Sequence, residues 1–346
     1  MFLTVGITVF NEETRLPAML GSLEAQDWSL FEVRFSDDGS TDRTEDVVRE
    51  FAQRHPGKVF YERHGNMGPG LSRNRIIPQA KGEYLWFCDG DDAIVPQAIS
   101  AMAHCLEGMS YDIVSFLCGS GGDSQTALNS VPIPLTRSQA VQCISGATCA
   151  KILKTEFLRQ NSILFPETRI GEDLVFSLRA TCFAQTACFW YEKPYCYIRR
   201  QASLSSDLDD RFMDHMARSI ACMDRQAEEF PEFRLEIQYR SFQARWYVLR
   251  RLEDDGTPEM KERYADEAWD GLKELVDRHE NPLLRSSFRL ISRNRSMGRK
   301  LQREQQKARQ REQRLEKDIQ AMEKSLSWRL TSPLRALGRI LSHKNS

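Results

Sequence analysis

The segment GEYLWFCDGDD, residues 82–92, places three aspartates at the end of an apolar run that is typical of a buried strand. Asp89, Asp91 and Asp92 lie within four positions, and the next Lys or Arg along the chain is Arg137. Carboxylates this close repel one another and resist full ionisation unless a cation lies among them. Their oxygens suit Mg²⁺ or Mn²⁺, usually with substrate phosphates completing the coordination shell. The alternative is a solvated turn whose aspartates cap a helix.

Two further segments contain residue types that suit a nucleotide ligand. SDDGSTD, residues 36–42, is typical of a helix-capping turn, although a carboxylate in it could also accept from a pyrimidine N3–H or ribose hydroxyls. HGNMGPGLSRNR, residues 64–75, is a Gly-rich loop leading into a predicted helix, where backbone N–H groups and Arg73 could contact a diphosphate. Arg73 stands where a dinucleotide fingerprint needs its third glycine, so a dinucleotide site is disfavoured, and the sequence contains no P-loop motif.

Short apolar segments that alternate with helical patterns must position these residues. The predicted strands are Leu3–Phe10, Phe31–Ser36, Lys58–Arg63, Glu83–Cys88 and Asp112–Leu117. The alternation predicts an α/β fold with a doubly wound, mostly parallel sheet. Ligands bind at the carboxyl ends of the strands in such sheets. The first four ends read FNEE, SDDGSTD, GNMGPG and CDGDD, so the sequence predicts a polar, acidic site at that edge.

Length and composition allow two domains with a well-buried core. The chain has 346 residues, of which 41% are hydrophobic and 28% charged, and this excludes a disordered chain. The nine cysteines form no C-x-x-C pair and suit free thiols in a reducing cytoplasm. The amino terminus reads as a strand rather than a signal peptide, and no run approaches the ~18 apolar residues that span a bilayer. We therefore expect a cytoplasmic protein, soluble or peripheral at the inner face of the membrane.

The C-terminal part differs in charge and pattern. From Arg285 onward there are 17 Lys and Arg against 5 Asp and Glu, whereas the preceding part is acidic. Leu301, Ala308, Leu315 and Met322 recur every seven residues, which predicts a coiled-coil-like helix, and an amphipathic segment follows it. Homo-oligomerisation or peripheral membrane contact is favoured over nucleic acid, because few aromatic side chains are available for stacking. The predicted domains are a catalytic α/β domain (1–205), a helical extension (206–290) and a basic tail (291–346).

The order of the motifs resembles the glycosyltransferase family 2 enzymes of the GT-A fold. The chain reads VGITVFNEE, SDDGSTD, GNMGPGLSRNR, GEYLWFCDGDD and finally GED at 171–173, and the match covers about residues 3–205. The resemblance implies an inverting glycosyltransferase of polysaccharide biosynthesis, with a D-x-D motif. Such an enzyme would move a sugar from a nucleotide-diphosphate sugar, most simply a UDP-sugar, to a hydroxyl of a surface glycan or lipid-linked acceptor. The alternative is a catalytically silent nucleotide-sugar-binding subunit of a glycan assembly complex.

The resemblance also implies which residues bind the donor. Phe10 matches the aromatic residue that packs on the base, and Asp38 matches the residue that hydrogen-bonds it. Asp89, the first Asp of D-x-D, matches the group that faces the ribose or sugar. The other residues assigned to nucleotide-sugar binding are Asn11, Glu12, Asn66, Gly68, Arg73 and Arg200.

The resemblance further implies a metal site and a catalytic base. Asp91 matches the direct metal ligand, with Asp92 in support. Asp173, beside Glu172, matches the general base that takes the proton of the acceptor hydroxyl, a role typically worth ~10²–10⁴ in rate. Mn²⁺ or Mg²⁺ would stabilise the departing diphosphate. Arg200 stands where many relatives have a His, and since Arg cannot ligate a metal, weak or optional metal dependence is expected.

Overall fold

The computed structural model describes residues 1–120, 128–198, 207–278, 284–289 and 291–292. The chain divides into two compact units, Met1–Asn281 and Pro282–Ser346, and every element below belongs to the first. The predicted coiled-coil-like helix and amphipathic segment fall almost entirely within 293–346, outside the described residues, so they stay predictions, as do oligomer and membrane contacts. In the described part of the chain, no helix is both long and apolar enough to cross a membrane.

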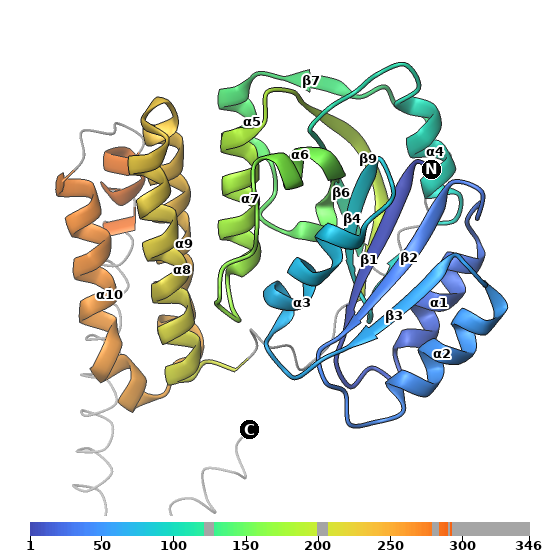
Figure 1. The fold of residues 1–346 in the computed structure, drawn as a ribbon. Helices are drawn as coiled ribbons and strands as arrows, with labels where there is room; N and C mark the ends of the chain where they lie inside the picture. Colours follow the sequence, from blue (N-terminus) through green and yellow to red (C-terminus); the bar gives the residue numbers. More distant parts are fainter. Residues whose placement is uncertain (121–127, 199–206, 279–283, 290, 293–346) are drawn as a thin grey trace, which may run out of the picture. The chain divides into compact units, whose positions relative to one another are not determined.

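Four parallel strands form the N-terminal half of the sheet, in the order β3-β2-β1-β4 (Figure 1). Its elements are β1 (Leu3–Val9), α1 (Leu16–Glu24), β2 (Phe31–Asp37), α2 (Thr44–Arg54), β3 (Val59–Arg63), α3 (Pro69–Ile76), the 3₁₀ helix η1 (Ile77–Gln79) and β4 (Tyr84–Asp89). Each of these strands was predicted to within one residue at either end. The parallel pairing that the strand–helix alternation predicts is confirmed.

The side chains of β4 alternate between two apolar layers. Tyr84, Trp86 and Cys88 pack in the layer that contains α1 and α2, whereas Leu85 and Phe87 pack in the layer that contains α3 and α7 (Glu172–Phe183). Full burial of an apolar side chain contributes about 1.5–3 kcal/mol. Because both faces are covered, the strand stays apolar until its last residue reaches the edge of the sheet.

The second half of the sheet is mixed. β8 (Lys151–Lys154) lies between β4 and β6 (Ile113–Ser120) and runs antiparallel to both, and β9 (Ala187–Tyr197) pairs parallel with β6. The other elements here are β5 (Ala93–Ile94), α4 (Ala98–Cys105), β7 (Ile133–Leu135), α5 (Arg137–Cys143), η2 (Thr148–Ala150) and α6 (Thr155–Gln160). β5, β7 and β8 were not predicted, because segments of two to four residues are too short to show alternation.

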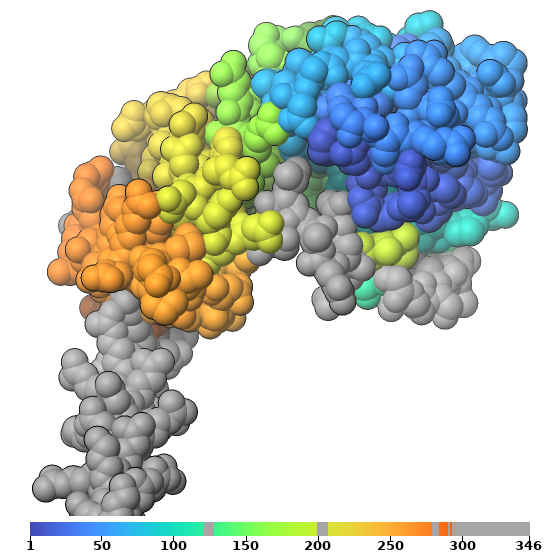
Figure 2. All heavy atoms as spheres, turned by 90° about the horizontal axis from the view of Figure 1, so that it is seen from below, coloured from blue at the N-terminus to red at the C-terminus, as the bar shows by residue number. Residues whose placement is uncertain are grey.

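Three long helices follow the sheet. They are α8 (Asp210–Glu229), α9 (Arg234–Asp255), which the 3₁₀ helix η3 (Pro231–Phe233) precedes, and α10 (Pro258–Arg278). Apolar side chains of α8 and α9 share a core with α5 and α7, and Figure 2 shows yellow α8 against the green residues of α7. The predicted helical extension is thus helical, and α8 and α9 each bury a set of apolar side chains. The predicted boundary at residue 205 stays a prediction.

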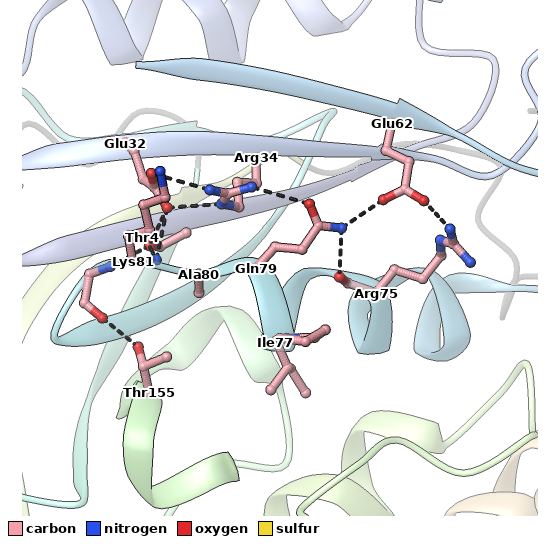
Figure 3. Close-up of polar contacts among 12 residues, drawn as sticks. Thr4, Glu32, Arg34, Glu62, Arg75, Ile77, Gln79, Ala80, Lys81 and Thr155 are labelled. Carbon is pink, nitrogen blue, oxygen red and sulfur yellow. Dashed lines mark hydrogen bonds and ion pairs between the residues drawn. The ribbon is translucent and has the colours of Figure 1, made fainter. Parts of the chain in front are cut away.

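A polar network that is buried at Thr4, Glu32 and Arg34 and exposed at Gln79 ties the start of the sheet to the segment that follows α3 (Figure 3). Thr4 donates to Glu32 at 3.0 Å, and Arg34 donates to Glu32 at 2.8 Å and to Gln79 at 3.2 Å. Gln79 in turn donates to Glu62 of β3 at 2.7 Å. Buried polar groups need such partners, because an unpaired one costs about 1–3 kcal/mol. The network therefore fixes the C-terminal end of α3 on the sheet, at the opposite end of this helix from the Gly-rich loop.

Candidate active site

The carboxyl ends of β1, β2 and β4 lie side by side, as the sequence predicts. The last residue of β1 pairs with Asp37, and the residue before it pairs with Asp89. Asn11, whose φ of 55° lies in the left-handed region, joins the first two loops. Its backbone N–H donates to Ser40 Oγ at 2.9 Å, and its Oδ1 accepts from the Thr41 N–H at 2.8 Å. The predicted donor residue Asn11 thus holds the FNEE and SDDGSTD segments together.

The two adjacent aspartates of SDDGSTD make different contacts. Asp37 accepts from the Tyr61 hydroxyl at 2.6 Å, and burial together with this carboxylate raises the pKa of Tyr61. Asp38 accepts from the backbone N–H groups of Met67 at 2.7 Å and Gly68 at 2.9 Å. Each oxygen of Asp38 therefore binds the Gly-rich loop. This contact makes Asp38 a support of the loop, and its predicted contact with a base stays a prediction.

The Gly-rich loop has a backbone shape that its glycine permits. Gly68 has a φ of 96° and directly precedes α3, and a Cβ at this position would lie 2.9 Å from Cγ of Arg169. Arg169 also donates from Nη2 to the backbone oxygen of Asn66 at 3.0 Å. Only glycine adopts such a φ without strain. Arg169, two residues before the GED motif, thus lies against the loop that carries the predicted donor residues Asn66 and Gly68.

Two predicted donor residues after β1 differ in exposure. Phe10 is 43% exposed, as a ring that stacks on a ligand would be. Glu12 is buried, where its backbone N–H donates to Thr44 Oγ1 at 2.8 Å and its Oε2 accepts from Arg15 Nε at 2.6 Å. Glu12 therefore shapes the loop. The predicted donor residue Arg200 lies outside the described residues.

Arg73 connects the D-x-D motif to the GED motif. Its side chain is 7% exposed and donates to Asp89 Oδ1 from Nη2 at 2.7 Å and to Glu172 Oε1 from Nη1 at 3.1 Å. Burial lowers the pKa of Arg73, but Asp89 and Glu172 outweigh this effect and the pKa is raised. The carboxylates thus keep the buried guanidinium charged. Its Nε is among the few buried side-chain atoms of the described residues that have no hydrogen-bond partner.

The two carboxylates at the start of α7 differ in access to solvent. Glu172 is buried in its ion pair, whereas Asp173 is half-buried and accepts from the backbone N–H of Leu174 at 2.8 Å. Burial raises the pKa of both carboxyl groups, and the charge of Arg73 opposes this rise. A partly solvent-accessible carboxylate with a raised pKa is suited to accept a proton from a substrate. The geometry thus favours Asp173 over Glu172 as the predicted base.

Asp92 is tied to β9. Its Oδ2 accepts from the Tyr195 hydroxyl at 2.6 Å, and its Oδ1 accepts from the backbone N–H of Ile198 at 2.8 Å. Tyr195 also accepts from the backbone N–H of Asp89 at 3.1 Å. Burial raises the pKa of Asp92 to about 7, and Asp89 and Asp91 add to the rise. Asp92 therefore fixes the end of β4 against β9.

These contacts bear on the predicted metal site. Among the described residues, no group of three His, Cys, Asp or Glu side chains is arranged to hold a metal ion. Both Asp92 oxygens accept hydrogen bonds from the protein, and one oxygen of Asp89 contacts Arg73. Asp91 is 8% exposed at the same turn. A divalent cation often binds one or two carboxylates plus substrate phosphates. A cation at this turn would therefore need oxygens from a bound ligand in addition to the aspartates.

Three side chains that shape this site were not predicted from the sequence. They are Tyr195 of β9, Arg169 before α7 and Lys151 of β8. Arg169 could have been suspected from its position two residues before the GED motif. Lys151 lies in a segment too short to show a pattern, and Tyr195 lies in an aromatic segment typical of a strand, so nothing in their local pattern distinguishes them. Their contacts arise only when β8 and β9 join the sheet.

The comparisons with known proteins agree with the geometry. Residues 4–145 match the family model described as "Glycosyl transferase family 2". The chain is 29% identical over 209 residues to the poly(ribitol-phosphate) beta-N-acetylglucosaminyltransferase TarS of Staphylococcus aureus, covering 58% of this chain and 36% of that protein. It is 29% identical over 207 residues to a poly(ribitol-phosphate) beta-glucosyltransferase of Bacillus spizizenii, covering 57% of this chain and 32% of that protein. The match thus spans about a third of the length of these relatives.

Solved structures show the same fold. The crystal structure of S. aureus TarS 1–349 in complex with UDP-GlcNAc superposes with a TM-score of 0.61 at 22% identity, covering 80% of this chain and 82% of that chain. This likeness confirms the predicted GT-A fold. The family match contains nearly all of β1, β2 to β4 and the four polar segments at their carboxyl ends. Residues 4–145 are therefore similar to glycosyl transferase family 2, and the fold is that of the solved TarS structure.

Proposed function

We propose that this chain is an inverting glycosyltransferase that moves a sugar from a UDP-sugar to a hydroxyl of a surface glycan or lipid-linked acceptor. The observation that carries the proposal is the position of Arg73, which contacts Asp89 of the D-x-D motif and Glu172 of the GED motif. Through this one side chain, a donor-binding segment and a base-bearing segment share one site. A capping turn and a helix start with unrelated roles would have no reason to meet through a buried cation.

The proposed chemistry needs few protein groups. Asp173 takes the proton of the acceptor hydroxyl while the hydroxyl oxygen attacks the anomeric carbon. The bond from that carbon to the diphosphate breaks, and its electron pair leaves with UDP. Attack opposite the leaving group inverts the anomeric configuration. Arg73 holds Asp89 and Glu172 in place throughout, because both ion pairs lie within the protein.

Donor binding is assigned to the loops around β1, β2 and β4. The exposed ring of Phe10 would stack on the base, and the loop that Asp38 and Arg169 support would approach the diphosphate. A divalent cation, Mn²⁺ or Mg²⁺, would be held by Asp91 and the donor phosphates, and would neutralise charge on the leaving group. Asp92 would support this site indirectly, through Tyr195.

The relatives suggest the donor and acceptor classes. TarS is named a beta-N-acetylglucosaminyltransferase and has been solved with UDP-GlcNAc, and the B. spizizenii relative is named a beta-glucosyltransferase. We therefore propose a UDP-hexose or UDP-N-acetylhexosamine as the donor. Both names include poly(ribitol-phosphate), a polymer rich in hydroxyl groups, so a hydroxyl-bearing surface polymer is the proposed acceptor class.

The test is a panel of UDP-glucose, UDP-galactose and UDP-GlcNAc with poly(ribitol phosphate) and other hydroxyl-bearing glycans as acceptors. The proposal predicts UDP release with at least one donor, and a product whose anomeric configuration, measured by proton NMR, is opposite to that of the donor. Retention of configuration would contradict the inverting mechanism. Binding of UDP-sugars without release on any acceptor would favour the catalytically silent subunit instead.

A further inference from the structure

Lys151 is a charged residue in the core of the sheet. It begins β8, the strand between β4 and β6, and its side chain is 0% exposed. Its Nζ donates to the backbone oxygen of Ala147 and to Ser177 Oγ, the latter at 3.0 Å. Ser177 Oγ in turn donates to the backbone oxygen of Gly146 at 2.6 Å. Burying an ammonium group is costly, so its retention here calls for a role.

The contacts of Lys151 converge on the first turns of α7. Ser177 lies four positions after Asp173, so both side chains are on one face of this helix. Gly146 packs directly on the same helix, because a Cβ at that position would lie 2.3 Å from Cδ2 of Leu174. The segment before β8 is therefore held to α7 by the hydrogen bond from Ser177 to Gly146 and by the close approach of Gly146 to Leu174, and Lys151 of β8 adds a hydrogen bond to Ser177. These contacts fix the turn that presents Asp173.

The charge of Lys151 also balances the acidic site. No carboxylate among the described residues forms an ion pair with Lys151, whereas Arg73, another buried cation, contacts Asp89 and Glu172 directly. Burial lowers the pKa of Lys151 to about 8, and Cys149 and Asp173 oppose this fall. The ammonium is therefore still mostly protonated at neutral pH.

The charged groups around the two residues are few. The groups that act on Asp173 are Arg73, Lys151, Asp89 and the adjoining Glu172. Those that act on Lys151 are Cys149, Asp173, Arg240 and Cys118. Arg73 and Lys151 both lower the pKa of Asp173, against the rise that burial causes. Arg73 already forms ion pairs with two other carboxylates, whereas the positive charge of Lys151 is not used in an ion pair among the described residues.

We propose that Lys151 is a positioning residue of the transferase site, which joins the first turns of α7, through Ser177, to the segment before β8, through Ala147, and keeps Asp173 ionised. It touches neither donor nor acceptor and acts through Asp173. This inference rests on the proposed function, because it gives Asp173 the part of the base. Its structural half, the effect of Lys151 on the ionisation of Asp173, can be measured without any substrate.

The test compares Lys151→Met with Lys154→Met in the full chain. Lys154 lies on the same strand, but its Nζ donates to Ser110 near the surface, so its loss controls for removing a Lys from β8. The carboxyl carbon of Asp173, assigned with Asp173→Asn, is titrated by NMR in each protein. In parallel, UDP release from UDP-GlcNAc is followed as a function of pH.

The expected result is a higher titration midpoint for Asp173 in Lys151→Met and an unchanged one in Lys154→Met. Where UDP release is detected, the acid limb of kcat/KM should move to higher pH in Lys151→Met alone, with a loss on the order of tenfold below the midpoint. An Asp173 titration identical to wild type in Lys151→Met would overturn the inference. If wild type releases no UDP, the proposed donor is wrong, but the titration still decides the role of Lys151.

A second variant covers the case in which Lys151→Met does not fold. Ser177→Ala removes the hydroxyl that joins Lys151 to α7 and keeps the ammonium. We expect kcat for UDP release to fall several-fold with the KM for UDP-GlcNAc unchanged, because the base is misplaced and the donor loops are not. In the absence of turnover, the Asp173 carboxyl signal should shift in Ser177→Ala. Unchanged kcat, or without turnover an unchanged signal, would overturn the positioning role.

Discussion

Arg73 of α3 donates from Nη1 to Glu172 Oε1 of α7 at 3.1 Å, across 99 positions of sequence. The same guanidinium donates to Asp89 from Nη2. The pairing joins a helix that follows the Gly-rich loop, the last residue of β4 and the first residue of α7. Three motifs that lie far apart in the sequence therefore meet at one buried cation, and the stability of the site depends on it.

Replacing Arg73 should destabilise the protein. Arg73→Met leaves two carboxylates without their cation, one of them buried, and breaking a buried ion pair in this way costs about 3–5 kcal/mol. Urea denaturation should show this loss in the free energy of unfolding. Arg75→Met on the same helix is the matched control, because Arg75 pairs with Glu62 at the surface and exposed pairs contribute about 0–1 kcal/mol. Equal losses in the two variants would contradict the bridging role.

Gly68 should tolerate no side chain. In Gly68→Ala, the φ of 96° is strained and the new Cβ meets Arg169, so a loss of about 1–3 kcal/mol is expected. Nucleotide binding should weaken as well, because the loop moves. Gly65→Ala in the same loop is the control, since a Cβ there meets nothing within 4 Å. Thermal unfolding and UDP titration of both variants check this, and similar behaviour of the two would argue against a fixed loop.

Glu172 and Asp173 of the GED motif should affect different properties, Asp173 the catalytic rate and Glu172 the stability. Asp173→Asn removes the proposed base and should lower kcat by roughly 10²–10⁴ with little change in UDP affinity. Glu172→Gln keeps Asp173 but weakens the ion pair with Arg73, so it should reduce stability more than Asp173→Asn does. Steady-state UDP release and urea denaturation measure the two effects. Full activity in Asp173→Asn would remove it as the base.

Lys151 should give the stability of the protein a specific pH dependence. Its pKa is lowered to about 8 in the folded state, and the unfolded value is ~10.4. Between these values the unfolded state binds more protons, so the free energy of unfolding attributable to Lys151 rises with pH, by roughly 3 kcal/mol in total. Below pH 8 the folded state bears the full cost of the buried charge.

Lys151→Met removes this contribution. The free energy of unfolding of Lys151→Met, relative to that of wild type, should therefore be highest near pH 7. This difference should shrink as the pH rises towards 10. Urea denaturation at several pH values measures the difference, with Lys154→Met as the control. A difference that does not change with pH would mean that the pKa of Lys151 is the same in the folded and unfolded states, so that burial does not lower it.

The sequence predicted the parts of this fold that follow from local patterns. Strands such as Leu3–Val9 and Tyr84–Asp89 are continuous apolar runs, and the polar segments after them had to lie at the sheet's carboxyl edge. What could not be predicted depends on contacts between distant segments. The bidentate contact of Asp38 with the Gly-rich loop, and the tie between Asp92 and Tyr195, leave no trace in the local pattern.

The same reasoning explains the change in role of some predicted donor residues. Arg73 follows a Gly-rich loop, and such a position suits diphosphate binding as well as it suits an internal ion pair. The contacts of the Arg73 nitrogens with Asp89 and Glu172 become evident only in the folded structure, where α7 lies beside α3. Glu12 likewise has the pattern of a polar loop residue, but in the structure it forms hydrogen bonds with Arg15 and Thr44. The burial of a charge depends on tertiary packing, which the local sequence does not encode.

The measurement that tests the account most directly is a calorimetric titration of UDP, GDP and CDP into the wild type and Asp91→Asn, with and without Mn²⁺. Asp214→Asn, on the exposed side of α8, is the control. The account predicts that UDP binds selectively, that Mn²⁺ tightens binding, and that only Asp91→Asn loses this gain. Failure of the wild type to bind any of the three nucleotides, with or without Mn²⁺, would contradict a nucleotide-sugar site at the end of β4.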